Sequence, residues 1–281
     1  MDAGGALLER RVRRLAKQTQ NAVSNLRLKN PESLHDARVA LRRLESVLHE
    51  LGWIFIDLNE VHEITSRLRK LSNRLQQFRD LTVVSDILNE FQKTESTQTM
   101  DQLVTIGLRL GTTQDREHAK VRRLVRTRDH LRAIKVIRKR VSKLKVVQGR
   151  AEQIDLALED YLESSENILR RALSNIDYQA ETGRNLHKLR VRVKRARYVA
   201  EFVRTSRVAN DDTFFGRQQV ALEYSPIQGQ LGRIHDLMVF DAWLERKAGK
   251  RTSLRAAVRL LNGRSARAQQ LARQALAQMP W

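Results

Sequence analysis

The sequence predicts an all-α protein, and three observations support that fold class. Only 12 glycines and 3 prolines occur in 281 residues, which is too little turn material for a sheet protein with many hairpins. The apolar content of 41% is ordinary, but with 5% aromatic residues the core is left mostly to Leu, Val, Ile and Ala. Two sequence markers recur in the same order about half a chain apart, which indicates an internal duplication of helical segments.

The first half of the chain reads as four helices. Asn30-Pro31-Glu32 is a clean helix start, with a capping Asn, a Pro in the first turn and an acid facing the helix N-terminus. Gly52 is a plausible stop for the same helix, and residues 94–113, rich in Thr, Ser, Gln and Gly, read as a loop or a short, poorly anchored helix. The four helices are expected at about 5–28, 32–51, 58–93 and 114–147.

The second half repeats this arrangement. Gly183, Asn210-Asp211-Asp212 and Gly249 mark the joints, and Pro226 is expected to kink the third helix or to end its first section. Helices are expected at about 150–174, 182–206, 211–249 and 251–278. The simplest architecture is a single domain of two repeats, about 1–148 and 149–281, each a four-helix bundle related to the other by a pseudo-twofold axis.

The duplicated markers are a basic helix and an aspartate-containing helix. The basic marker reads L-H-x-x-R-V-x-φ-[RK]-R, where φ is apolar, at Leu34–Arg43 and Leu186–Arg195, and L-x4-D-L-x-V follows at Leu75–Val83 and Leu231–Val239. At about 100° per residue, three basic positions of each basic helix fall on one face, beside the apolar stripe rather than opposite it. We therefore expect them to line a groove or cavity between helices. The first row is His35, Arg38 and Arg42; the second row is His187, Arg190 and Lys194, flanked by Arg197 and Tyr198.

This chemistry suits phosphate. Arginine offers a planar fork of donors to phosphate oxygens, lysine a compact charge, and histidine two donors in the protonated form that a nearby phosphate favours. Cations one helical turn apart, roughly 5 Å, can follow the successive charges of a linear polyanion. A basic run on a helix is usually a solvated face, but duplication of the histidine as well as the arginines favours a binding role. The net charge of +21 points to a polyanionic partner in any case: nucleic acid, an acidic membrane surface or polyphosphate.

Lys120–Arg150 carries many cations and a single acid, Asp129. These charges lie all round the predicted helix, so we expect a mixture of groove lining and solvated surface.

The acids of the second marker, Asp80 and Asp236, have three interpretations. They are structural acids that orient arginines, catalytic acids or metal ligands, and the structural role is favoured because neither has a companion carboxylate at helical spacing. The chain has no cysteine, which excludes disulfides, thiolate metal sites and cysteine nucleophiles, and it has no P-loop, G-x-S-x-G or H-E-x-x-H pattern. We therefore expect no catalytic residue, no metal and no cofactor.

No stretch of the sequence approaches the roughly 20 apolar residues of a membrane span, and Met1–Gln20 lacks the apolar run of a signal peptide. A soluble, cytoplasmic protein is expected, and association with polyphosphate or storage granules is left open.

In the order of its motifs the chain resembles the CHAD family (conserved histidine α-helical domain). The resemblance rests on the duplicated helices, on Arg197-Tyr198 and on Gln228-x2-Leu231-Gly232-x3-Asp236-Leu237 in the second half. It implies two helical bundles around a basic cavity or surface that binds inorganic polyphosphate without an established reaction. Two positions depart from the pattern: Gln76 stands where Gly is typical, and His235 replaces the first-half Arg79. Carried over by position, the candidate ligands are both rows, with Arg69, Arg79 and Arg197 as additions.

The leading prediction is therefore a non-catalytic module that binds inorganic polyphosphate. A nucleic-acid-binding protein is the alternative, favoured by Lys120–Arg150 but lacking a reader motif and many aromatics for base stacking. A phosphohydrolase with His35 or His187 as acid or nucleophile comes third, because the metal-carboxylate set of such chemistry is missing.

Overall fold

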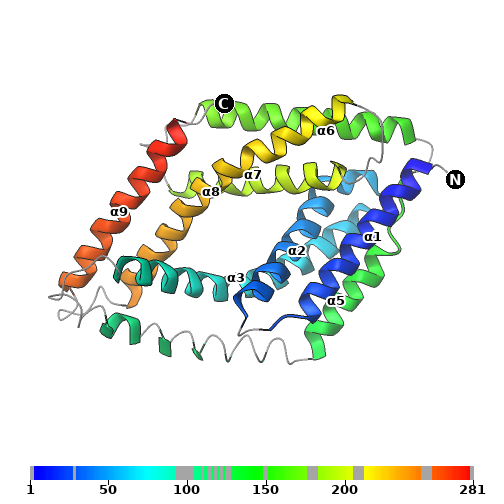
Figure 1. Cartoon of the computed structure of the whole chain (residues 1–281). Helices are drawn as coiled ribbons and strands as arrows, with labels where there is room; N and C mark the ends of the chain where they lie inside the picture. Colours follow the sequence, from blue (N-terminus) through cyan, green and yellow to red (C-terminus); the bar gives the residue numbers. More distant parts are fainter. Residues whose placement is uncertain are drawn as a thin grey trace. The chain divides into compact units, whose positions relative to one another are not determined.

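The computed structural model describes most of the chain as helix (Figure 1). The described residues are 3–27, 30–92, 104–108, 111–112, 115–116, 119, 123, 128–147, 151–175, 183–204, 212–247 and 255–278. The elements are α1 (Ala3–Ser24), α2 (Pro31–Glu50), the 3₁₀ turn η1 (Gly52–Ile54), α3 (Leu58–Gln92), α5 (Arg128–Val141), α6 (Ala151–Ser174), α7 (Gly183–Arg204), α8 (Asp212–Lys247) and α9 (Arg255–Ala277). The predicted all-α fold class is confirmed.

Most helix boundaries lie close to those predicted, and the start of α2 has the predicted cap. The Asn30 side-chain oxygen accepts hydrogen bonds from the backbone N–H groups of Glu32, at 2.9 Å, and Ser33, at 3.3 Å. Pro31, at the first helical position, has no N–H to leave unsatisfied. The helix therefore begins where its sequence supplies an acceptor for the first-turn donors.

Three predicted details are decided by the structure. Residues 104–108 are helical, and Ile106 is buried, so part of the predicted 94–113 segment takes the short-helix alternative. The helix predicted over 114–147 ends at Val141, because Val146 instead forms an isolated antiparallel bridge with Phe55. Finally, α8 is continuous through the exposed Pro226, so the alternative in which this proline ends a section of the helix is wrong. The rest of the 94–113 segment, apart from 111–112, lies outside the described residues.

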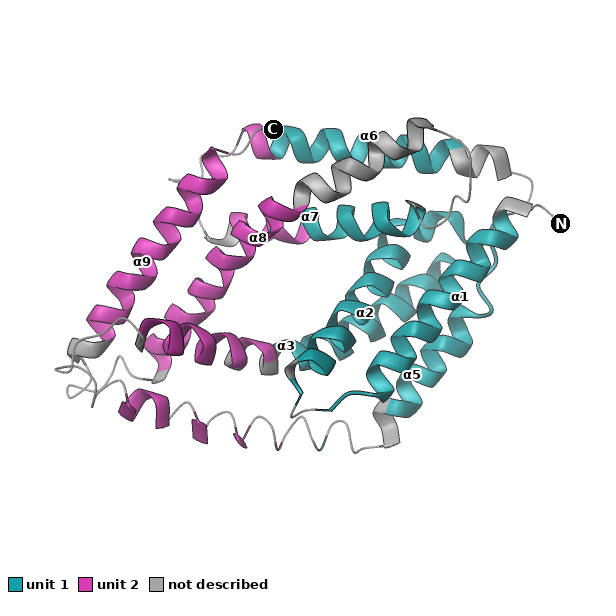
Figure 2. Ribbon diagram, in the orientation of Figure 1, with its two compact units in different colours: residues 1–76, 121–172, 192–224 teal, residues 77–120, 173–191, 225–281 magenta. Residues whose placement is uncertain are grey.

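The chain forms two compact units, and each takes residues from both halves of the sequence (Figure 2). Unit 1 comprises residues 1–76, 121–172 and 192–224, and unit 2 comprises residues 77–120, 173–191 and 225–281. Helix α3 alone has 35 residues and α8 has 36, which at 1.5 Å per residue is about 50 Å, longer than the diameter of a small domain. Helix α3 contributes residues to both units, and so does α8, so the packing units cut across the sequence repeats. The repeat boundary near residue 148 stays a prediction.

The core of unit 1 lies where α1 packs against both α2 and α5. The predicted apolar stripe of α2 is buried throughout: Ala37, Leu41, Leu44, Leu48 and Leu51 are each at most 1% exposed. Polar side chains also link the helices. The fully buried Thr19 hydroxyl lies 2.9 Å from the Leu15 carbonyl in α1 and 3.2 Å from the Ala40 carbonyl in α2, and Arg140 of α5 pairs with Glu60 and Glu63 of α3.

The core of unit 2 gathers apolar side chains from the second part of α3, from α8 and from α9. Phe91 and Phe240 meet edge to face, with ring centroids 5.7 Å apart, a favoured aromatic geometry. Arg264 of α9 donates to the Phe91 carbonyl at 2.9 Å, so it satisfies an acceptor in the last turn of α3.

Candidate anion-binding site

The first row lies at the border between the buried and exposed faces of α2. Because Leu34, Ala37 and Leu41 face the core, the positions beside them emerge at its edge. His35 is exposed, and Arg38 and Arg42 are half-buried. The structure thus places the three residues of the first row as the helical periodicity predicts.

Two polar side chains of α3 contact the arginines of the first row. Arg38 Nη2 donates to Gln76 Oε1 at 2.6 Å, and Arg42 Nε donates to Ser72 Oγ at 2.8 Å. One step further along, Arg69 Nε of α3 lies 3.1 Å from Glu45 Oε1 of α2.

These three contacts follow one register. Each step of three or four residues forward along α2 is matched by the same step backward along α3, as in antiparallel helices with side chains meeting turn by turn. The register determines which arginines meet an acid. Ser72 and Gln76 are neutral, so neither contact cancels the charge of the arginine it holds. Glu45 is a carboxylate, and its side chain is only 8% exposed.

Arg69 was predicted as an additional ligand, but it is engaged with a buried acid, and an anion binding there must compete with Glu45. Ser72 and Glu45 were not predicted from the sequence, and Gln76 was noted only as a departure from the family pattern, not as a partner of Arg38. The available signal was the spacing of Ser72 and Gln76, four residues apart on α3, which matches the spacing of Arg38 and Arg42 on α2.

The second row lies on successive turns of α7, with His187 exposed and Arg190 and Lys194 half-buried. In unit 2, the His187 ring packs against that of His235 from α8, with Nδ1 atoms 3.3 Å apart and ring centroids 4.8 Å apart. His235 is one of the two departures from the family pattern, and it lies directly against the signature histidine. The contact brings two titratable imidazoles together, each a donor from both nitrogens once protonated.

The flanking arginine of α7 is engaged within unit 1. Arg197 Nε lies 3.2 Å from Glu201 Oε1, and its guanidinium stacks 5.3 Å from the centre of the Tyr198 ring. Both contacts hold the side chain against its own helix. Of the predicted ligands in unit 1, Arg197 is thus, like Arg69, paired with an acid.

Asp236, one of the two aspartates of the second marker, contacts an arginine. Arg79 Nη2 lies 3.1 Å from Asp236 Oδ2, and both side chains are 25–30% exposed. Nearby, burial raises the pKa of the Asp86 carboxyl; the positive Arg79 lowers it, and the negative Asp236 raises it further. Asp80 is half-buried and makes contacts of its own. The Arg79–Asp236 pair fits an orienting role for Asp236, and that role remains a prediction.

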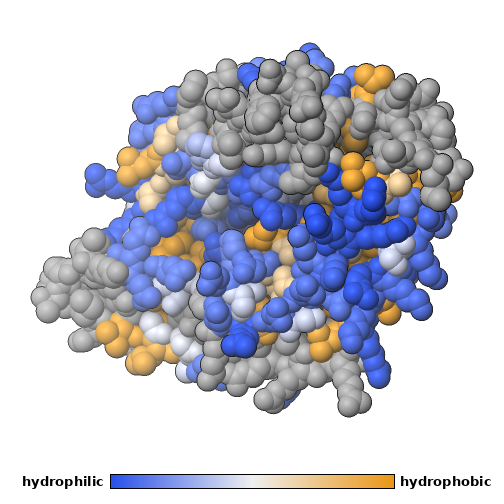
Figure 3. Space-filling view, turned by 45° about the vertical axis from the view of Figure 1, so that its right-hand side comes forward, coloured by the Kyte–Doolittle hydropathy of each residue, from blue (hydrophilic) through white to orange (hydrophobic). Residues whose placement is uncertain are grey.

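Within the basic stretch between Lys120 and Arg150, the cations of α5 include two groups: one contacts acids and the other lines a groove. Arg140 donates hydrogen bonds to the carboxylates of Glu63 and Glu60 on α3, and these contacts raise its pKa. The hydrogen bonds from Arg140 and Arg67 hold the pKa of Glu63 at about 2. Lys135, Arg138 and Lys139 instead line a groove of about 590 Å³ with Arg13 and Lys17 of α1. Figure 3 shows one face of the molecule, and hydrophilic side chains cover most of its described surface.

Within the described part of the chain, no three His, Cys, Asp or Glu side chains gather as a metal site would require, and no helix combines the length and hydropathy of a membrane crossing.

Comparison with known proteins gives a family and a fold. The model of the CHAD domain matches residues 6–245. PptA from Streptomyces chartreusis is 15% identical, with a TM-score of 0.76 over 98% of each chain. The crystal structure of the CHAD domain from the plant Ricinus communis is 18% identical, with a TM-score of 0.70 over 99% of this chain and 93% of that one. At such identities the likeness establishes the fold alone. No curated protein matches the chain.

Proposed function

We propose that this chain, which belongs to the CHAD-domain family, binds long inorganic polyphosphate and acts as a binding module without catalysing a reaction. The observation that carries the proposal is the way α3 holds two arginines of the first row. Arg38 and Arg42 lie one turn apart, and each donates to a neutral acceptor, Gln76 or Ser72. These contacts fix the direction of two guanidinium groups at neutral acceptors, on successive turns of one helix.

The arrangement suits a chain of phosphates better than a single one. Residues four apart on a helix rise by about 6 Å, so the two arginines can engage successive phosphates of a linear polymer. The same basic pattern recurs in the second row on α7. A single small anion needs only one such cluster.

A linear polyanion leaves a specific thermodynamic signature. Each phosphate charge that is neutralised releases counter-ions, so the logarithm of the binding constant falls linearly with the logarithm of the salt concentration, with a slope of about −0.7 per contact for a single-stranded polymer. The proposal therefore predicts strong salt dependence and affinity that rises with the number of phosphates in the chain.

Calorimetric titration with orthophosphate, short polyphosphate and long polyphosphate tests this. The Arg38→Ala/Arg42→Ala variant is expected to bind long polyphosphate at least tenfold more weakly and with a salt slope smaller by about 1.4. The matched control is Arg259→Ala/Arg267→Ala, which removes two exposed arginines of α9 and the same net charge. Equal affinity for orthophosphate and long polyphosphate, or equal losses in both variants, would rule the proposal out.

Nucleic-acid binding remains the second candidate because of the groove between α1 and α5. Its cations, among them Lys135, Arg138 and Lys139, form a basic surface on a different pair of helices from the first row. If nucleic acid is the ligand, substitutions at these three residues abolish binding to single-stranded DNA while Arg38→Ala/Arg42→Ala does not.

The proposal extends to cellular location. A polyphosphate-binding module is expected in the cytoplasm and at polyphosphate granules. A fluorescent fusion should co-localise with a polyphosphate dye, and the Arg38→Ala/Arg42→Ala variant should lose that co-localisation.

A further inference from the structure

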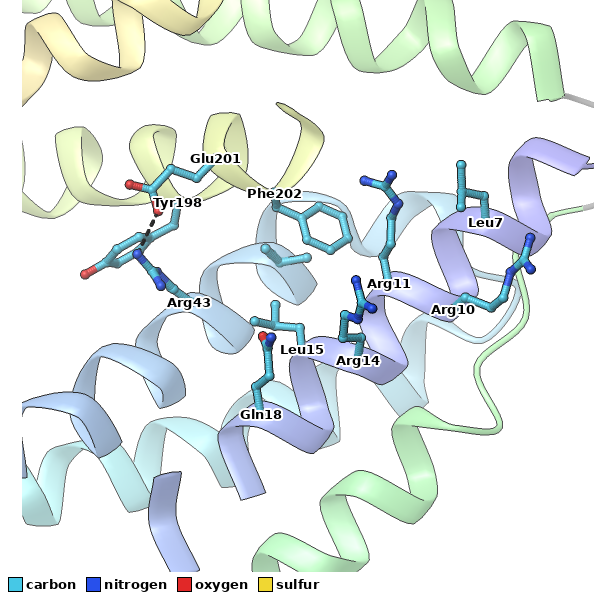
Figure 4. A pocket seen from close by; sticks show the side chains of 11 residues that line it. Leu7, Arg10, Arg11, Arg14, Leu15, Gln18, Arg43, Tyr198, Glu201 and Phe202 are labelled. Carbon is cyan, nitrogen blue, oxygen red and sulfur yellow. Dashed lines mark ion pairs between the residues drawn. The ribbon is translucent and has the colours of Figure 1, made fainter. Parts of the chain in front are cut away.

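A pocket of about 840 Å³ opens in unit 1 between α1, α2 and the last turns of α7 (Figure 4). The pocket shares no residue with the first row. The α2 residues that line it are Arg43 and Val47. Its volume lies within the 300–1,000 Å³ typical of sites for small molecules. Two kinds of side chain meet in it: arginines of α1 and apolar side chains from all three helices.

The arginine side of the pocket is electrostatically unfavourable when empty. Arg11 and Arg14 lie three residues apart on one face of α1, with Arg10 beside them. Arg11 Nη1 is buried and has no hydrogen-bond partner among the residues that the structure describes. Burial lowers the pKa of Arg11, and the positive charge of Arg14 lowers it further. A partly desolvated guanidinium beside a like charge is stabilised by an anion that neutralises both.

Arg43, the fourth arginine of the pocket, already has a counter-charge. Its Nη2 lies 3.1 Å from Glu201 Oε2, and its guanidinium lies 5.8 Å from the centre of the Tyr198 ring. The dashed line in Figure 4 marks this ion pair. An incoming anion is therefore expected at the arginines of α1 and not at Arg43.

Another part of the lining is apolar. Leu15 of α1, Val47 of α2 and Phe202 of α7 line it, and Figure 4 shows Phe202 projecting from α7 into the space that the Arg11 side chain approaches from α1. A bare inorganic anion gains nothing from such a wall, because its bound water would be displaced by groups that cannot hydrogen-bond. A ligand with an apolar body gains by covering this surface.

We infer that this pocket binds a small organic phosphate, with its phosphate groups at Arg10, Arg11 and Arg14 and its apolar body against Leu15, Val47 and Phe202. The ligand class is a diphosphate ester, in which a ring or an alkyl chain carries two linked phosphates. Nucleoside diphosphates and isoprenoid diphosphates share this chemistry. The site goes beyond the proposed binding of inorganic polyphosphate, since it selects for the part of the ligand that polyphosphate lacks.

Calorimetric titration with three probes tests the inference: inorganic pyrophosphate, ADP and geranyl diphosphate, at equal ionic strength. At least one ester is expected to bind tenfold or more tightly than pyrophosphate, and the tighter ester identifies the source of the apolar body. Tenfold corresponds to about 1.4 kcal/mol, which the burial of roughly 60 Å² of apolar surface supplies. The heat-capacity change should also be more negative for that ester than for pyrophosphate. If neither ester binds more tightly than pyrophosphate, the inference is wrong.

Two variants locate the site. Arg11→Ala/Arg14→Ala is expected to weaken binding of the ester at least tenfold, whereas the charge-matched Arg259→Ala/Arg267→Ala leaves it within twofold. Leu15→Ser, at a half-buried position, should bring the affinity for the ester down toward that for pyrophosphate. Thermal unfolding followed by circular dichroism checks that each variant is folded at the titration temperature. An ester affinity in folded Arg11→Ala/Arg14→Ala equal to that of the wild type would contradict the assignment.

Discussion

Replacing Gln76 by alanine removes the acceptor that holds Arg38 and leaves the arginine itself in place. Gln76 Oε1 lies 2.6 Å from Arg38 Nη2, and both side chains are half-buried. The substitution therefore asks whether the orientation of an arginine in the first row matters for binding, separately from its charge. It also tests a position at which the chain departs from the glycine typical of the family.

The expected magnitude follows from the contact. A hydrogen bond to a charged group contributes about 1.5–3 kcal/mol when well buried, and half-exposure reduces that to ~1 kcal/mol. Alanine offsets a few tenths of a kcal/mol because it is the best helix former. We therefore expect the free energy of unfolding to fall by less than about 1 kcal/mol, while affinity for polyphosphate falls roughly three- to tenfold as the guanidinium loses its fixed direction.

A double-mutant cycle isolates this effect. Polyphosphate affinity is measured by calorimetry for the wild type, Gln76→Ala, Arg38→Ala and the double variant, with Gln270→Ala on an exposed face of α9 as the control. Once Arg38 is absent, Gln76→Ala should have no further effect, which gives a coupling energy of ~1 kcal/mol. If the two losses simply add, Gln76 does not act through Arg38 and the reasoning is refuted.

Three further predictions concern unit 2. Asp236→Asn removes the partner of Arg79 and is expected to lower the free energy of unfolding by ~0.5–1 kcal/mol, measured by urea denaturation at low salt; an unchanged midpoint would show that the pair is neutral. His187→Ala/His235→Ala should weaken polyphosphate binding severalfold, because it removes two ring donors that lie against each other beside the second row; an unchanged affinity would remove these rings from the site. Burial raises the pKa of the Asp241 carboxyl, so the stability linked to this group is present below the unfolded pKa, about 3.9, and is lost as pH rises through the folded value. Asp241→Asn should therefore gain stability relative to the wild type as pH rises from about 4 to 7; thermal melts with a constant difference over that range would contradict this.

The apolar stripe of α2 shows what the sequence could predict. Ala37, Leu41 and Leu48 recur at helical spacing, and that spacing alone determines which face is buried. The positions of His35 and Arg38 beside the stripe follow from the same geometry. The start of the helix could also be predicted, because Asn30 is a typical capping residue and does cap it.

Contacts between helices could not be predicted in the same way. The partners of Arg38 and Arg42 depend on the register in which α2 and α3 pack, and that register is a product of the whole interface. Ser72 and Gln76 are common residues on a long helix, and their four-residue spacing alone does not show which helix they face. Their significance emerges only once each lies opposite an arginine.

The sharing of a long helix between packing units could not be read from the sequence. Periodicity predicted the long helices α3 and α8, but it carries no information on how many bundles one helix crosses. Each compact unit draws on both halves of the sequence. Pro226 is a similar case: proline disfavours a helix interior, but the surrounding helix continues through it at an exposed position.

The most direct test of the account compares two polyanions on one protein. The purified chain is titrated with long polyphosphate and with single-stranded DNA of matched length, at several salt concentrations, beside the variant His35→Ala/Arg38→Ala/Arg190→Ala. The account predicts that the wild type prefers polyphosphate and that the variant loses this preference. Equal binding of both polymers, unchanged in the variant, would contradict it, because the positive charge of the chain would then act without a specific site.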